Sequence, residues 1–104
     1  MSVQEQMISF YNAIAGDPRI GVTHISIYMA LLGKWDGSKD HPMQLTRQQI
    51  MRFAKISARQ TFNKCMHELN RYGYIKYVPA TGPYQPGCIY LLKLHEEMMK
   101  VGKS

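Results

Sequence analysis

The chain has little cysteine, no long apolar run and no internal repeat, and each absence excludes a class of protein. Two cysteines, Cys65 and Cys88, are too few for a disulfide framework, so both thiols are expected to be free in a reducing compartment. No apolar run approaches the ~18–20 residues of a membrane span. The first ten residues lack the basic region and apolar stretch of a secretory signal. We therefore expect one cytoplasmic domain over residues 1–104 and no membrane partner.

The motifs of enzymes and metal sites are missing as well. There is no glycine-rich phosphate loop and no Gly-x-Ser-x-Gly sequence. Cys65-x-His67 could suggest a nucleophile or a metal site, but Cys65 falls on an inward helical face, where an inert buried thiol is expected. The histidines lack zinc-ligand spacing; they are His24, His41, His67 and His95. We predict no enzyme activity, catalytic residue, metal, cofactor or small-molecule ligand.

Positive charge is gathered in one stretch of the chain. Residues 46–77 contain seven lysines and arginines and one acid, Glu68, which gives a net charge of +6. The other residues contain six basic and six acidic side chains and are neutral overall. Such a concentration of cations in a small chain favours a nucleic-acid partner.

Apolar spacing predicts two helices in the first third of the chain. The first helix covers residues 1–15, with Ser2 and Glu5 forming a capping box. Its apolar stripe consists of Val3, Met7, Phe10, Tyr11 and Ile14. The second helix follows Thr23 as N-cap, and its stripe consists of Ile25, Tyr28, Met29, Leu32 and Trp35. Residues 36–44 are rich in turn-forming residues and are predicted to be a loop.

Two shorter helices and two strands are predicted in the rest of the chain. Thr46 and Gln49 form a capping box for a helix over residues 47–55, with Ile50, Phe53 and Ala54 inward. Ser57 can cap a helix over residues 58–72, which Gly73 ends in a left-handed conformation. Its inward residues are Phe62, Cys65, Met66 and Leu69. Strands at 74–78 and 88–94 flank a Pro/Gly-rich loop at 79–87, and a short helix is expected at 95–101.

The stretch Thr61-Phe62-x-x-Cys65-Met66-x-x-Leu69-x-x-x-Gly73-Tyr74-Ile75 resembles the recognition-helix-to-wing segment of bacterial winged helix–turn–helix regulators. The resemblance covers residues 23–94. It implies a mainly α, α+β fold, in which a three-helix core and a β-hairpin wing follow an extra N-terminal helix. Residues 95–104 would form a C-terminal tail. The implied partner is double-stranded DNA.

The outer face of the predicted third core helix suits the major groove of DNA. Arg and Lys can donate to guanine, and Asn and Gln can pair with adenine. The blander reading is that any exposed helix face is polar. The start of the preceding helix is a natural phosphate anchor. The predicted DNA-binding residues are Arg47, Gln48, Lys55, Ser57, Ala58, Arg59, Gln60, Asn63, Lys64, His67 and Lys76.

Several functions remain open at this stage. A sequence-specific bacterial transcriptional regulator comes first. The alternatives are a replication or recombination accessory protein of a plasmid, phage or conjugative element, and a winged helix that binds protein. The loop at 79–87 has no Lys or Arg; its polar candidates are Thr81, Tyr84 and Gln85. We expect a homodimer through the stripe of the first helix, unless that stripe packs on its own subunit's core.

Overall fold

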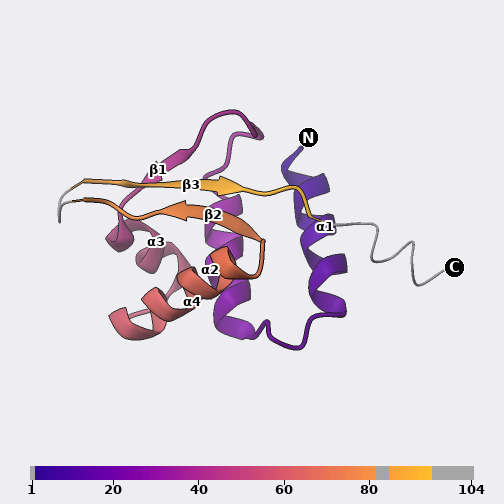
Figure 1. Ribbon diagram of the computed structural model, residues 1–104, viewed down its shortest axis with the longest axis horizontal. Coiled ribbons are helices and arrows are strands. Elements are labelled where there is room, and N and C mark those ends of the chain that lie inside the picture. Colours follow the sequence, from indigo (N-terminus) through magenta and orange to yellow (C-terminus); the bar gives the residue numbers. More distant parts are fainter. Residues whose placement is uncertain (1, 82–84, 95–104) are drawn as a thin grey trace, which may run out of the picture.

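The computed structural model describes residues 2–81 and 85–94, which form an α+β domain with four helices and a three-stranded antiparallel sheet (Figure 1). The predicted α+β class is confirmed. The helix expected at 95–101, and Tyr84, lie outside the described residues. The elements are α1 (Val3–Ala15), α2 (Val22–Leu32), β1 (Met43–Leu45), α3 (Arg47–Ala54), α4 (Arg59–Arg71), β2 (Ile75–Val78) and β3 (Gly87–Leu91).

The sheet has the strand order β1-β3-β2, with both pairs antiparallel. The predicted hairpin is confirmed, because Ile75 lies opposite Leu91 in β2 and β3. The loop predicted at 36–44 is partly wrong. Its last residues enter strand β1, in which Leu45 lies opposite Gly87. Three residues cannot show an alternation of period two, so this strand is set by its pairing with β3.

Helix α1 packs into the same core as the rest of the chain. The Phe10 side chain is fully buried, and its ring stacks on Tyr28 of α2 with centroids 3.8 Å apart. Met7 and Ile14 pack partly buried against this core. Most of the stripe predicted for the dimer interface therefore packs on its own subunit's core, the alternative given with that prediction. Two members of the stripe are exposed: Val3 and Tyr11.

Helix α2 begins earlier than the sequence predicted. Its N-cap is Gly21, and Thr23 lies inside the first turn, so the prediction of Thr23 as N-cap is wrong. The Gly21 N–H donates to Nδ1 of His24, 3.0 Å away, so the N3 side chain accepts the N–H of the N-cap residue as Glu or Gln does in a capping box. Ile27 and Leu31 are fully buried although the predicted stripe omitted them. The predicted members Ile25 and Met29 are only partly buried.

Helix α3 begins where the sequence predicted. The Gln49 N–H donates to Thr46 Oγ1 (3.1 Å) and the Thr46 N–H donates to Gln49 Oε1 (2.8 Å), so the capping box is confirmed. The prediction that Phe53 faces inward is wrong: its side chain is 47 % exposed, and the Lys34 ammonium lies 4.0 Å from its ring centroid. The other two predicted inward residues, Ile50 and Ala54, are buried.

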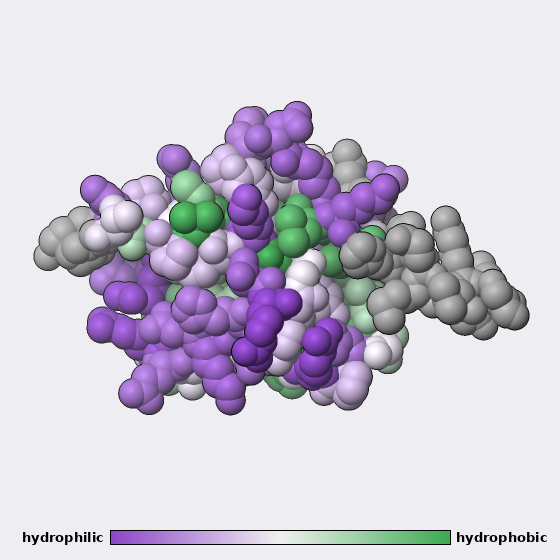
Figure 2. All heavy atoms as spheres, in the orientation of Figure 1, coloured by the Kyte–Doolittle hydropathy of each residue, from purple (hydrophilic) through white to green (hydrophobic). Residues whose placement is uncertain are grey.

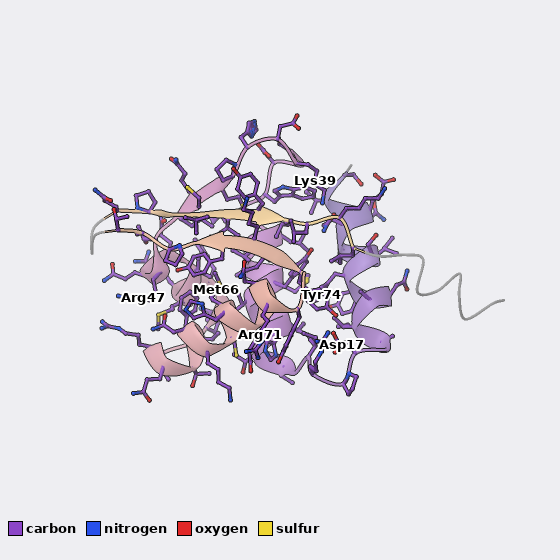
Figure 3. The ribbon with its side chains drawn as sticks, in the orientation of Figure 1. Asp17, Lys39, Arg47, Met66, Arg71 and Tyr74 are labelled. Carbon is purple, nitrogen blue, oxygen red and sulfur yellow. The ribbon has the colours of Figure 1, made fainter. Side chains whose placement is uncertain are left out.

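A buried polar network joins α1 to the sheet, and Figure 3 labels one of its members, Lys39. Gln6 of α1 is fully buried and donates to the Tyr28 hydroxyl at 2.7 Å. The Lys39 ammonium donates to Gln6 Oε1 (2.9 Å) and to the Leu91 carbonyl (3.0 Å). These partners are neutral oxygens, and burial, with Lys93 nearby, lowers the pKa of Lys39. The network satisfies polar groups that would otherwise be costly to bury.

Helices α3 and α4 end with the same backbone motif. After α3, the Ile56 N–H donates to the Met51 carbonyl and the Lys55 N–H to the Arg52 carbonyl. Gly73 closes α4 with the corresponding pair of bonds and has φ +89°, as predicted. Lys55 takes the same left-handed conformation, with φ 62°. Glycine usually fills this position because it has no Cβ, so a lysine there is unusual.

Candidate nucleic-acid interface

Helix α4 is held in place by its inner row of apolar side chains. Phe62, Cys65, Met66 and Leu69 are all buried, as the sequence predicted. Their spacing of three and four residues places them on one side of the helix. The predicted N-cap is wrong by one residue, because Ala58 precedes the helix, no side chain caps it, and Ser57 lies in the turn. The opposite side of α4 is therefore left to solvent.

The outer side of α4 and the preceding turn carry most of the predicted site residues. Figure 2 shows hydrophilic side chains gathered over this part of the molecule. The cationic members are Arg47, Lys55, Arg59 and Lys64. All are exposed, and none forms an ion pair with a carboxylate among the residues that the structure describes. The remaining predicted members are the exposed Gln48, Ser57, Ala58, Gln60 and His67, and the half-buried Asn63. Four unpaired cations thus lie at the start of α3, in the turn and on α4.

Three basic residues of the 46–77 stretch are not among these four: Arg52 in the last turn of α3, Arg71 and Lys76. Arg71 lies in the last turn of α4, where its guanidinium is 5.3 Å from the Tyr72 ring centroid. Lys76 lies opposite Tyr90 in the sheet, and its ammonium is 5.6 Å from that ring. Because Ile75 beside it points into the core, Lys76 points to the other face of the sheet. The structure therefore separates Lys76 from the outer side of α4.

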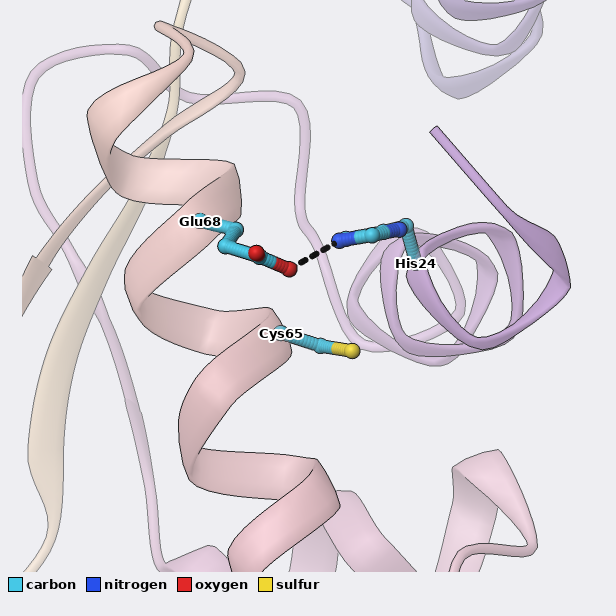
Figure 4. Close-up of side chains that lie close together, drawn as sticks. All are labelled: His24, Cys65 and Glu68. Atoms are coloured by element: carbon cyan, nitrogen blue, oxygen red, sulfur yellow. Dashed lines mark hydrogen bonds and ion pairs between the residues drawn. The ribbon is translucent and has the colours of Figure 1, made fainter. Parts of the chain in front are cut away.

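A hydrogen bond from His24 joins α2 to α4 (Figure 4). Its Nε2 is 2.8 Å from Glu68 Oε1, and its Nδ1 accepts the Gly21 N–H. Since Nδ1 accepts a hydrogen bond, Nε2 carries the ring proton and donates to Glu68. That bond lowers the pKa of Glu68. The only acid of the basic stretch is thus bound on the inner side of α4, and its orientation depends on α2.

Cys65 lies close enough to this pair to suggest a metal site. The ligand atoms of His24, Cys65 and Glu68 lie within 4.8 Å of one another. A neutral histidine that binds a metal through Nε2 must be protonated at Nδ1. Here Nδ1 accepts the Gly21 N–H, which places the ring proton on Nε2, and a protonated Nε2 cannot bind a metal. Burial also raises the pKa of the Cys65 thiol. We interpret the cluster as a packing contact.

The turn between α3 and α4 is anchored from α2. The Ser26 hydroxyl donates to the Ala54 carbonyl, the last residue of α3. Lys55 follows in its left-handed conformation, with its side chain exposed. One helix therefore fixes both parts of the candidate interface: Ser26 fixes the turn and His24 fixes α4. These contacts reduce the reorganisation that α4 would need to bind a partner.

A cleft of about 410 Å³ lies between the start of α3 and the hairpin. Tyr77, which the sequence analysis did not single out, lies in its lining next to Arg47. The Tyr77 N–H donates to Asn70 Oδ1 (2.9 Å), and its ring is 6.2 Å from that of His67. Burial raises the pKa of Tyr77, and the Arg47 guanidinium partly offsets this increase. A Cβ at Gly87 would lie 3.1 Å from the Val78 carbonyl oxygen and 3.2 Å from the Tyr77 ring, so a larger residue there would require these groups to shift.

The position of Tyr77 could not be read from the sequence, because strand alternation does not show that α3 lies beside this residue. The cleft also brings Thr81 and Gln85 beside the start of α3. Their side chains bond to each other, with Thr81 Oγ1 donating to Gln85 Oε1 at 2.7 Å. The hairpin thus adds uncharged polar groups to one end of the cationic surface.

Comparisons of the chain with protein-family models, curated proteins and solved structures found no match. Among the described residues, no helix is long and apolar enough to cross a membrane. The functional interpretation therefore depends on the geometry and charge of the surface itself.

Proposed function

We propose that this chain is a winged helix–turn–helix protein that binds double-stranded DNA, with α4 in the major groove. The observation that carries the proposal is the set of four exposed cations on α4, the turn and the start of α3, none of which pairs with a carboxylate in residues 2–81 or 85–94. An α-helix fits the major groove, and the exposed arginine, lysine and glutamine of α4 can read base edges there. A bacterial transcriptional regulator that acts as a homodimer is the role we favour.

Each segment of the surface has a distinct part in the proposed complex. Arg59, Gln60 and Lys64 lie on the first two turns of α4 and would contact bases. Lys55 in the turn and Arg47 at the start of α3 would contact phosphates, where the free N–H groups of the first turn of α3 also point. The hydroxyl and amide groups of the hairpin loop would contact the backbone beside the cleft.

Salt dependence tests the electrostatic part of the proposal. If Arg47, Lys55, Arg59 and Lys64 each neutralise one phosphate, the logarithm of the binding constant should fall with the logarithm of salt concentration with a slope of about −3.6 per copy. The measurement is a titration of labelled random-sequence duplexes over a range of salt concentrations. A slope near zero would contradict phosphate binding by this surface.

Charge reversal tests which surface binds. The double variant Arg59→Glu with Lys64→Glu should lose duplex binding at low salt. The matched control, Arg71→Glu with Lys93→Glu, makes the same change in net charge on exposed side chains at the far end of α4 from Arg59 and after β3. Equal binding by both double variants would refute the assignment of α4. If the parent binds no duplex at low salt, the protein-binding alternative becomes the better interpretation.

Selection from the random duplexes tests base readout. On the selected sequence, Arg59→Ala should weaken binding by about 1–3 kcal/mol, the worth of a bidentate base contact, and should relax the preference at one position. Lys55→Ala should weaken binding by a similar factor on all duplexes. If Arg59→Ala binds the selected and random duplexes as the parent does, α4 does not read bases.

A further inference from the structure

The outer side of α1 carries a second apolar stripe. Ile8 is 51 % exposed and Tyr11 is 47 % exposed. Gln4 and Ala15, also exposed, lie in the same row, so the four positions are spaced by four, three and four residues. This spacing produces the seam along which two helices pack side by side. The row is separate from the side of α1 that Phe10 buries in the core.

The stripe is symmetric about a point midway between residues 9 and 10. An antiparallel copy of the helix would place Ile8 opposite Tyr11 of the second copy, and Gln4 opposite its Ala15. We propose that α1 pairs with α1 of a second copy about a two-fold axis in this register. A two-fold interface must be self-complementary, and this row is complementary to itself. This inference rests on the proposed function, because DNA binding by a homodimer is what requires two copies. The surface that would join the copies comes from α1.

Charge favours a second copy of this chain as the partner that binds the exposed stripe of α1. The net charge of +6 lies in residues 46–77, so the cationic surface on α3, the turn and α4 repels the same surface of another copy. Glu5 is the only charged side chain of α1, and the capping box with Ser2 engages it. The stripe itself is uncharged. Two copies can therefore pack along this stripe without like-charge repulsion. An acidic partner would find no opposite charge on it.

The size of the stripe sets the strength of the dimer. A helix of 13 residues is about 20 Å long and ~10 Å wide, a contact of roughly 200 Å² per partner. Stable interfaces bury about 800 Å² per partner. The pairing is therefore weak in free solution, and two adjacent DNA half-sites would strengthen it by holding two copies together. Figure 1 shows α1 at the end of the molecule away from α3, so the pairing leaves the cationic surface free.

A charge-swap experiment without DNA tests the register. Sedimentation equilibrium at high micromolar concentration should show that Tyr11→Glu self-associates at least about tenfold more weakly than the parent. Ile8→Lys should be equally weak. An equimolar mixture of the two should recover the parent's association, because the ammonium introduced in one chain then faces the carboxylate introduced in the other. Asn12→Lys, an exposed change beside the stripe, is the control and should associate as the parent does.

Cysteine cross-linking provides a second measurement for a weak dimer. Ile8→Cys and Tyr11→Cys, each combined with Cys88→Ser, should form disulfides several-fold faster when mixed than either variant alone. The proposal is overturned if mixing gives no gain in either experiment, or if Tyr11→Glu associates like the parent. Because these measurements contain no DNA, their failure leaves DNA binding intact. Failure of the parent to bind duplex would overturn only the proposed function.

Discussion

Replacing Lys55 by glycine should make the protein more stable and make it bind DNA more weakly. Lys55 has φ 62° and ψ 40°, the left-handed conformation that costs a residue with a Cβ roughly 1–2 kcal/mol. Glycine avoids this cost but loses about 0.5–1 kcal/mol through its greater freedom in the unfolded chain. The net gain should be ~0.5–1 kcal/mol. For a domain of this size it corresponds to a rise in Tm of roughly 2–8 °C.

The same substitution removes one cation from the proposed interface. The slope of the salt dependence should then become less steep by about 0.9, and affinity should fall by a similar factor on all duplexes. Lys55→Ala separates the two effects, because alanine keeps the backbone strain and lacks the charge. Lys55→Arg keeps both. The Tm from thermal unfolding and the affinity from duplex titration would be compared for the parent and the three variants, Lys55→Gly, Lys55→Ala and Lys55→Arg.

Two results would refute this reasoning. If Lys55→Gly is no more stable than Lys55→Ala, the left-handed conformation of Lys55 carries no cost. If Lys55→Gly binds duplex like the parent, the ammonium does not contact phosphate. A gain in stability together with a loss of binding would indicate that a strained lysine is kept for its charge, as is common where strain lies at functional sites.

Three further predictions concern stability. Phe10→Ala should cost about 3–5 kcal/mol in urea unfolding, since the ring is fully buried; a cost below about 1 kcal/mol would show that α1 is not part of the core. Asp17 accepts hydrogen bonds from Arg19 and Tyr74, which lower its pKa, so its contribution is present above about pH 4 and is lost as pH falls further. Asp17→Asn should be less stable at neutral pH and show a flatter acid profile; an unchanged profile would contradict this. Glu68→Gln should be more stable than Glu68→Ala, since an amide oxygen still accepts the proton of His24; equal Tm values would show that this bond contributes nothing.

Local patterns in the sequence predicted the features that local physics controls. The capping box of Thr46, the inner row of α4 and the left-handed Gly73 depend on residues within four positions of each other. The predicted hairpin also depends on a simple alternation. These features together position the outer side of α4, so the proposed interface was visible in the sequence.

The features that were missed depend on partners far along the chain. Strand β1 forms only because β3 lies beside it, more than forty residues later. The start of α2 depends on a histidine ring acting as a cap, which residue preferences at N-caps do not anticipate. The inward turn of Phe10 follows from its stacking on Tyr28, and no helical spacing distinguishes a core stripe from a dimer stripe.

The bond from Tyr77 to Asn70 has a consequence for the open edge of the sheet. Strand β2 is at the edge of the sheet, and an edge strand with free N–H groups can recruit a strand from another molecule. The backbone N–H and C=O groups of Lys76 and Val78 point toward β3. Those of Tyr77, which lies between them, therefore point to the open edge. Asn70 of α4 occupies that donor. The helix proposed to read DNA therefore also occupies one backbone donor on this edge, so that donor is not available to a strand from another molecule.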